Sequence, residues 1–148
     1  PYTQWHENGQ KYFEIHFKNG EKDGLETHWY ENGQKKQEGH WKDGVQDGFW
    51  QFWYSNGQKK HEAHWTSGKL DGPYSYWYES GQKEEEAHYK NVKLDGLLTA
   101  WHKNDQKSTE SIYKNGKPDG LETWWDVNGN KTNEIEYKDG KEISRKEF

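Results

Sequence analysis

Histidine and glutamate recur in this sequence at a fixed spacing of 24 residues, and both side chains can bind metals or move protons. Each histidine follows a glutamate of the series by two positions, at His16, His40, His64 and His88. Equivalent positions in neighbouring hairpins lie about 10 Å apart, so one metal ion cannot contact two of these histidines without a neighbour such as His28 or His61. We therefore interpret the histidines as a solvated polar row.

Glutamates and lysines form two longer series. Paired carboxylates hydrolyse glycosides when correctly spaced, but nothing sets one of these glutamates apart from the others. Identical copies are typical of architecture, so we predict cross-strand charge pairs worth about 0.2–1 kcal/mol each. The sequence carries no recognisable catalytic motif, and it predicts no enzymatic activity and no cofactor. The two series are Glu14, Glu38, Glu62, Glu86, Glu110 and Glu134, and Lys11, Lys35, Lys59, Lys83, Lys107 and Lys131.

A third candidate is a group of aromatic side chains in the middle of the chain. It departs from the repeat, because Glu26 and Glu122 occupy the position of Trp50 in the flanking units. Exposed rings on a polar sheet suit a peptide, a quaternary amine or a sugar, although such rings can also be a second packing surface. The predicted binding residues are Trp50, Phe52, Tyr54, Tyr74, Tyr76 and Tyr78, flanked by His28 and His102.

The composition limits what can position these groups. The chain has 148 residues, and its hydrophobic residues comprise 25 aromatic against only 16 aliphatic side chains, which excludes a thick aliphatic core. The net charge of -5 disfavours nucleic acid and anionic lipid as partners. The absence of cysteine excludes disulfides and a catalytic thiol, fits either redox compartment and leaves the localisation unknown.

The 24-residue spacing extends through the chain. We expect one repeat array over 1–148, with units of about 1–24, 25–48, 49–72, 73–96, 97–120 and 121–144. Pro1 and Phe148 fall at positions that suggest a piece of a longer array. The repeat is clearest in Asp-Gly pairs at 23–24, 47–48, 71–72, 95–96 and 119–120, in Trp5, Trp29, Trp53, Trp77, Trp101 and Trp125, and in the aromatic series Phe17, Trp41, Trp65, Tyr89, Tyr113 and Tyr137.

Each unit is predicted to be a β-hairpin, because Asn-Gly and Asp-Gly supply the positive-φ positions of short hairpin loops. We expect strands over 25–30 and 35–41, a three-residue loop with a glycine bulge between them, a second turn over 42–45 and a looser turn at Val92. Stacking of equivalent rings from neighbouring units is the expected main stabiliser. We predict one shared face for Leu25, Thr27, Trp29, Lys35, Gln37, Gly39 and Trp41.

The run from Trp29 to Gly48, with its Asn-Gly-Gln-Lys and Asp-Gly punctuation, resembles the MORN-variant repeat, and Lys114 to Gly120 matches the second half of that pattern. The resemblance covers about Tyr2 to Lys141. It includes the bacterial YwqK-type family, often described as antitoxins. The choline-binding cell-wall repeat is a rival resemblance, since it also alternates glycine, tryptophan and tyrosine in short hairpins.

Together these observations predict an all-β fold of tandem 24-residue hairpins in an elongated, twisted, nearly single-layer antiparallel meander. The predicted function is a non-enzymatic scaffold that binds a protein or peptide through the aromatic group, with an antitoxin or immunity role implied by the resemblance. The alternative is a carbohydrate or cell-wall binding module. Exposed terminal strands also predict self-association through the sheet edges.

Overall fold

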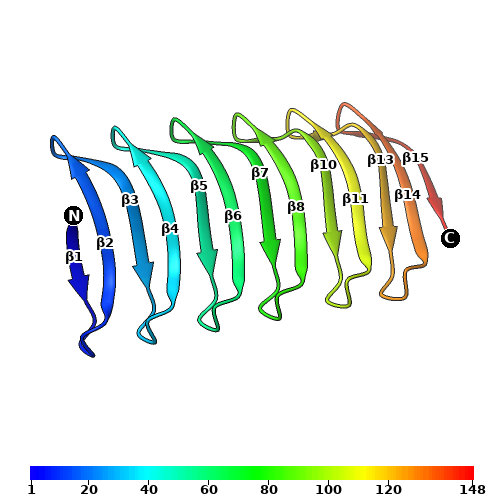
Figure 1. The fold of residues 1–148 in the computed structure, drawn as a ribbon. Helices are drawn as coiled ribbons and strands as arrows, with labels where there is room; N and C mark the ends of the chain where they lie inside the picture. The colour runs from blue at the N-terminus through cyan, green and yellow to red at the C-terminus, as the bar shows by residue number, and fades with distance from the viewer.

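The computed structural model describes residues 1–148 as one antiparallel sheet whose strands follow one another in chain order (Figure 1). This confirms the predicted hairpin meander. The chain forms no helix long and apolar enough to cross a membrane. The strands are β1 (Tyr2–Trp5), β2 (Lys11–Lys18), β3 (Glu21–Trp29), β4 (Lys35–Lys42), β5 (Val45–Trp53), β6 (Lys59–Thr66), β7 (Lys69–Trp77), β8 (Lys83–Lys90), β9 (Lys93–Leu94), β10 (Gly96–Trp101), β11 (Lys107–Lys114), β12 (Lys117–Pro118), β13 (Gly120–Trp125), β14 (Lys131–Lys138) and β15 (Lys141–Glu147).

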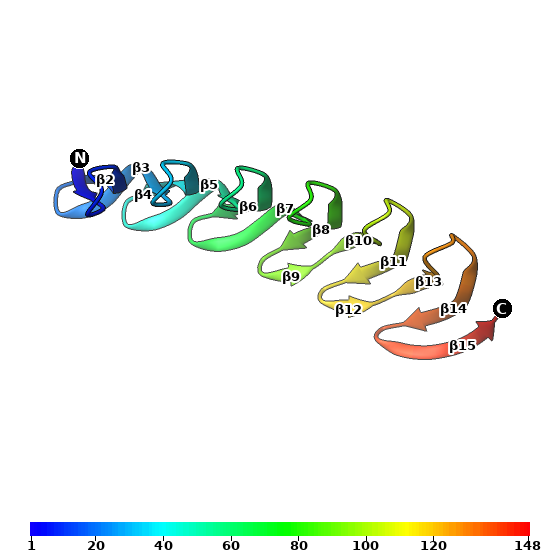
Figure 2. The ribbon, with the colours of Figure 1, turned by 90° about the horizontal axis from the view of Figure 1, so that it is seen from below.

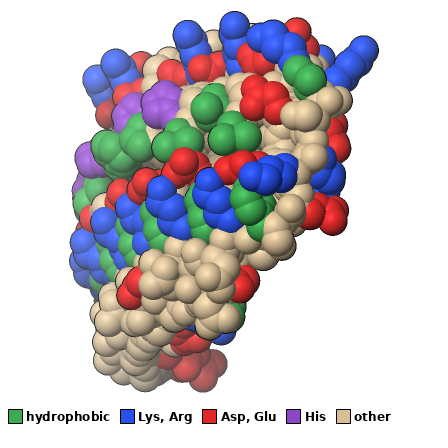
Figure 3. Space-filling view, turned by 90° about the vertical axis from the view of Figure 1, so that its right-hand side faces the viewer, with side chains coloured by type: hydrophobic (Ala, Val, Ile, Leu, Met, Phe, Trp, Pro, Cys, Tyr) green, Lys and Arg blue, Asp and Glu red, His purple; other side chains and the backbone are tan.

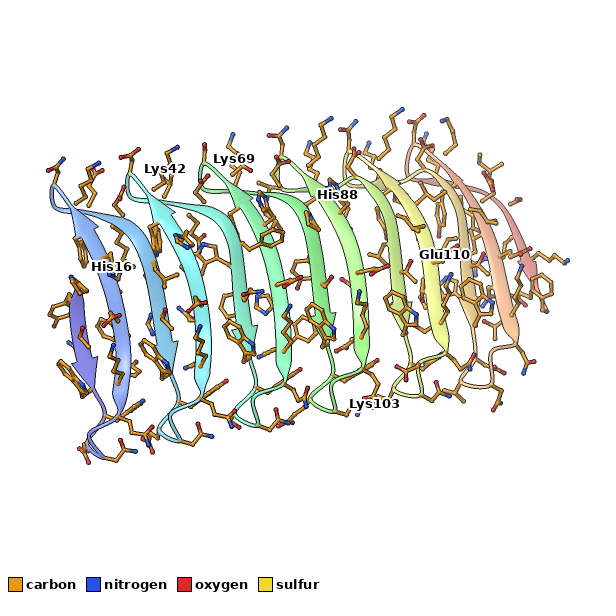
Figure 4. The ribbon with its side chains drawn as sticks, viewed as in Figure 1. His16, Lys42, Lys69, His88, Lys103 and Glu110 are labelled. Atoms are coloured by element: carbon orange, nitrogen blue, oxygen red, sulfur yellow. The ribbon has the colours of Figure 1, made fainter.

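Two kinds of turn alternate along the array, at opposite ends of the strands. Lys42 and Lys69 mark the upper turns in Figure 4, and Lys103 marks a lower one. The upper turns have two residues, both with positive φ, as at Asn19 (52°) and Gly20 (87°). This is the type I′ geometry, whose twist matches that of the strands.

The lower turns have three residues and a glycine with positive φ, as predicted. In the unit that follows β3, the amide of Gly33 donates to the carbonyl of Tyr30 at 2.9 Å, and the amide of Tyr30 donates to the carbonyl of Gln34 at 2.8 Å. Asp105 takes the glycine position in one unit with φ of 64°. The loop geometry therefore survives that substitution.

The expectation of a looser turn at Val92 is wrong. Val92 adopts φ of 68°, and its amide donates to the carbonyl of Leu70 at 2.8 Å, as Gly44 donates to Lys22 at 2.9 Å. The hydrogen bond to the preceding unit holds the turn in shape, so the valine accepts a conformation that is costly for a β-branched side chain.

We expect Val92→Gly to stabilise the protein by about 1 kcal/mol, because glycine adopts positive φ without the Cβ clash. The midpoint of urea unfolding measures this change. Val45→Gly is the matched control: Val45 lies exposed in a strand, where glycine lowers stability. A midpoint for Val92→Gly at or below that of the wild type would show that the backbone of Val92 is not strained.

The Asp-Gly pairs at 23–24, 47–48 and 71–72 lie inside strands, which begin earlier than the sequence predicts, whereas Asp95 and Asp119 separate β9 from β10 and β12 from β13. Strand β3 starts at Glu21 and contains Asp23 and Gly24 as a bulge opposite His16, with φ of 102° at Gly24. A Cβ on Gly24 would meet the His16 Cβ at 3.2 Å, so the glycine also makes room for that side chain. The bulge bends the strand, and each hairpin is curved when seen from below (Figure 2).

A second bulge overturns the predicted sharing of faces. Trp29 pairs with Lys35, but His28 pairs with Gln37, so Lys36 is an extra residue on the returning strand. From that point the register is shifted by one residue, and Gln37, Gly39 and Trp41 lie on the face opposite to Leu25, Thr27 and Trp29. The same shift occurs in every hairpin of the array.

The sheet consequently has two distinct faces. The ladder face carries the series of Trp29, Lys35, Glu38 and His40, and the aromatic face carries the series of Trp41 together with Gly39, Trp50, Phe52 and their equivalents. In the end view of Figure 3, hydrophobic and lysine side chains alternate in one row, beside a row of acidic side chains. Hydrophobic and histidine side chains form a further row on the same face.

Candidate functional site

The ladder face is built from charge pairs within a strand, rather than the cross-strand pairs predicted. Each lysine contacts the glutamate three residues later, as Lys35 Nζ contacts Glu38 Oε2 at 2.6 Å. Residues three apart share a face here only because of the bulge after the lysine. Thr27 Oγ1 also donates to Glu38 at 3.1 Å. The same pairs join Lys11–Glu14, Lys59–Glu62, Lys83–Glu86, Lys107–Glu110 and Lys131–Glu134.

Lysines, rather than stacked rings, connect the tryptophans of neighbouring units. Lys35 Nζ lies 5.8 Å from the ring centre of Trp53, and Lys59 Nζ lies 5.2 Å from that of Trp77. Equivalent rings are not stacked on one another, so the expectation of ring stacking as the main stabiliser is wrong. Each exposed cation–π contact contributes about 0.5–1 kcal/mol.

Polar side chains tie each unit to the next near the lower turns. The hydroxyls of Tyr54 and Tyr78, two of the predicted binding residues, donate to the carbonyls of Trp77 and Trp101 at 2.8 Å. His102, a predicted flanking residue, has its Nε2 2.9 Å from the carbonyl of Trp125. These three side chains therefore help to hold neighbouring units together.

Trp50 is buried rather than exposed, with only 3% of its surface accessible. Its indole lies against the backbone of Gly39, its Nε1 donates to the carbonyl of His40 at 3.2 Å, and Trp41 meets it edge-on at 5.4 Å. Glycine is required beneath it, because a Cβ on Gly39 would approach the ring atoms of Trp50 to 2.2 Å. Gly39 is therefore the small residue that allows the large ring of Trp50 to lie against the sheet.

The flanking units fill the position of Trp50 with a buried carboxylate. Glu26 accepts hydrogen bonds from Trp41 Nε1 at 2.7 Å and from Lys22 Nζ at 2.9 Å, and it contacts His28 Nε2 at 2.7 Å. Burial raises the pKa of Glu26, but the hydrogen bonds from Lys22 and His28 outweigh it and lower the pKa overall. His28 thus belongs to this network.

Phe52 and Tyr76 enclose a residue that sequence reasoning did not place in the group, His61. Its ring stacks on Phe52 at 4.0 Å and on Tyr76 at 5.7 Å, with an interplanar angle of 4° in the second pair. Its Nδ1 is buried without a hydrogen-bond partner. Burial, assisted by Lys60, lowers the pKa of His61 to about 4, so the ring is neutral at pH 7. The equivalent positions of the neighbouring units hold Gln37 and Glu85, so a histidine here departs from the repeat. That departure is the sequence signal that could have identified His61.

Next to this stack, an open cavity of about 400 Å³ lies on the aromatic face over β7 and β8, and it reaches Tyr54, which follows β5. It is lined by Tyr54, Tyr74, Tyr76, Glu84 and Glu85. Burial raises the pKa of Tyr54 to about 12 and also raises that of Tyr74, so both phenols stay neutral at pH 7. The structure therefore brings three of the six predicted residues together around one cavity, while Phe52 supports it from behind His61.

The histidine row lies on the ladder face, near the upper turns, where His16 and His88 are labelled in Figure 4. His16 Nδ1 lies 2.8 Å from the carbonyl of Leu25, and His64 Nδ1 lies 2.8 Å from that of Asp71. These two contacts give the histidines a role in holding the Asp-Gly bulges. No group of three or more histidine or carboxylate side chains is placed to hold a metal ion.

The two faces and the unit-to-unit bonds define a tandem hairpin repeat scaffold. The model of the family described as MORN repeat variant matches residues 1–19, 22–43, 70–91 and 118–139, which is more than half of the chain. The chain belongs to the MORN repeat variant family. No curated protein matches it.

Proposed function

We propose that this repeat scaffold is non-enzymatic and binds a protein or peptide partner through the aromatic face around Tyr74 and Tyr76. The observation that supports the proposal is the open cavity on the aromatic face, which lies beside rings that are held in place by stacking. Rigid aromatic side chains around a partly enclosed hollow are typical anchors for a partner side chain.

The neighbouring contacts support this location in particular. Tyr76 stacks on His61, and Tyr74 meets Tyr89 edge-on at 5.7 Å, so both rings are oriented before a partner arrives. Preorganised rings lose little conformational entropy on binding. Trp50 is not part of the proposed contact surface, because its ring is buried.

We expect Tyr76→Leu to weaken partner binding about ten-fold or more, since aromatic anchors commonly contribute over 1 kcal/mol. The partner is captured with the purified wild-type protein and identified, and its affinity for each variant is then measured by calorimetry. Phe49→Leu is the matched control, because Phe49 is an exposed aromatic residue on the ladder face. Far-UV circular dichroism confirms that each variant is folded.

Equal affinity of Tyr76→Leu and the wild type for the same partner would contradict the proposal. If only Phe49→Leu loses affinity, the partner binds to the ladder face instead. The carbohydrate alternative is tested on the same proteins by titrating tryptophan and tyrosine fluorescence with a glycan panel. A glycan response that Tyr76→Leu abolishes would replace the peptide partner with a sugar.

A further inference from the structure

The cavity on the aromatic face combines rings with negative charge. Three tyrosines line it together with the carboxylates of Glu84 and Glu85, and no lysine or arginine lines it. The π faces of tyrosine carry partial negative charge, so rings and carboxylates attract the same kind of ligand. A volume of about 400 Å³ is sufficient for one extended aliphatic side chain with a charged end.

Neither carboxylate is neutralised from within the chain. The adjacent Glu86 pairs with Lys83 at 2.7 Å on the ladder face, whereas Glu84 and Glu85 take part in no ion pair. Burial raises the pKa of Glu85, and the charge of Glu84 raises it further. The two acidic groups thus destabilise one another, and a bound cation would relieve this repulsion.

A carboxylate replaces a lysine of the repeat at this point. In the two preceding units a lysine of the chain covers a tyrosine: Lys36 Nζ lies 5.7 Å from the ring centre of Tyr30, and Lys60 Nζ lies 5.6 Å from that of Tyr54. Glu84 stands where Lys36 and Lys60 stand in those units. In that unit Tyr78 is covered from the next unit instead, by Lys103 Nζ at 5.7 Å from its ring centre. The exchange of lysine for Glu84 therefore places an additional carboxylate beside the cavity.

We propose that this cavity binds an alkylammonium group, and that the protein partner supplies it as a lysine side chain. The inference rests on the proposed function, since the lysine belongs to the partner that the aromatic face binds. The ammonium end would lie between Glu84 and Glu85, and the methylene stem would lie against the rings of Tyr74 and Tyr76. Such aromatic cages bind alkylammonium groups by cation–π attraction and by burial of the stem.

The test uses probes of known chemistry, followed by NMR chemical shifts of the tyrosine ring protons. The probes are a pentapeptide of four glycines around one lysine with blocked ends, its Nζ-acetylated form, and tetramethylammonium chloride. We expect the lysine peptide to bind and the acetylated peptide to bind about ten-fold more weakly, since acetylation removes the positive charge. Glu85→Gln should weaken binding of the lysine peptide by about ten-fold as well.

Glu86→Gln is the matched control, because it removes the same charge from the next residue of the same strand on the opposite face. It should leave peptide binding unchanged. Equal binding of the lysine and acetyl-lysine peptides, or equal effects of Glu85→Gln and Glu86→Gln, would overturn the inference. Binding of tetramethylammonium with exclusion of the peptide would support the ammonium site and assign it to a small amine.

The inference and the proposed function can fail separately. If Tyr76→Leu loses the captured partner while Glu85→Gln retains full affinity for it, the aromatic surface binds the partner without a lysine, and only the inference is wrong. If the lysine peptide binds in the cavity but the captured partner does not depend on Tyr76, the proposed function is wrong and the ammonium site stands without it.

Discussion

Replacing Gly39 with alanine is expected to lower the stability of the whole array by about 3 kcal/mol, at the upper end of the cost of overpacking. The new Cβ would lie 2.2 Å from Cδ2 and 2.4 Å from Cε2 of Trp50, and these are atoms of a rigid ring rather than of a flexible chain. Trp41 abuts the indole, which therefore has little room to move away. The small entropic gain of Gly→Ala does not offset such a clash.

Thermal unfolding measures the effect, with an expected fall in melting temperature of roughly 6–10 °C. The control is the double variant Gly39→Ala/Trp50→Leu, since leucine occupies the Trp50 position in the unit containing Leu98. The double variant should lose less stability than the sum of the losses in the two single variants, because removing the ring removes the clash. A melting temperature for Gly39→Ala equal to the wild type would show that the indole does not require glycine.

The second large effect concerns His61 and acidity. The pKa of this ring falls to about 4 in the folded protein, mainly through burial, whereas an unfolded histidine titrates near its usual 6.5. The unfolded state therefore takes up a proton first as the pH falls. Stability from the neutral ring is fully present above about pH 6.5 and is lost progressively down to pH 4, by about 2 kcal/mol in total, because the ring is only partly buried and solvent screens its charge.

Urea unfolding at pH 7.5, 5.5 and 4.5 measures this dependence. His61→Phe should lose less stability than the wild type over that range, because phenylalanine keeps the stack with Phe52 and Tyr76 and carries no proton. His88→Phe is the control, since His88 is exposed on the ladder face, and it should retain the wild-type decline. Parallel pH curves for the wild type and His61→Phe would contradict the burial of a neutral ring.

The turns were predictable from the sequence because their chemistry is local. The turns at Asn19-Gly20 and Asn32-Gly33 are recognisable from their residue types, because Asn19, Gly20 and Gly33 have positive φ and few residues other than glycine and asparagine adopt it. Val92 shows the limit of this reasoning. Local propensity predicted a loosened turn, but the hydrogen bond to Leu70 in the preceding unit holds Val92 in the geometry of a glycine.

The assignment of faces failed because it depended on residues whose effect is not local. A single extra residue at Lys36 exchanges the faces of the whole returning strand, and nothing about a lysine there marks a bulge. The spacing of three residues between Lys35 and Glu38 carried the missing information, since an ion pair at that spacing needs a bulge within a strand. The Asp23-Gly24 pair is similarly predicted to end a unit, although it bends the interior of β3.

The six predicted site residues lie in different environments. Tyr74 and Tyr76 line the cavity, whereas Trp50 is buried against Gly39. That distinction depends on which strand a ring meets, and the shifted register decides it. His61 was missed because its importance comes from two rings on neighbouring strands rather than from its own position in the repeat.

Bonds between units in this sheet reach only the next unit. Asn32 donates to the carbonyl of Ser55 at 2.8 Å, the carboxylate of Asp71 accepts from the amide of Asn91 at 3.1 Å, and the main contacts between strands join neighbours only. The number of units in the array and the surroundings of any one unit are therefore independent of each other. Whole units can be added or removed at either end without changing any neighbour of Tyr76, so the proposed site can be carried on a longer or shorter span.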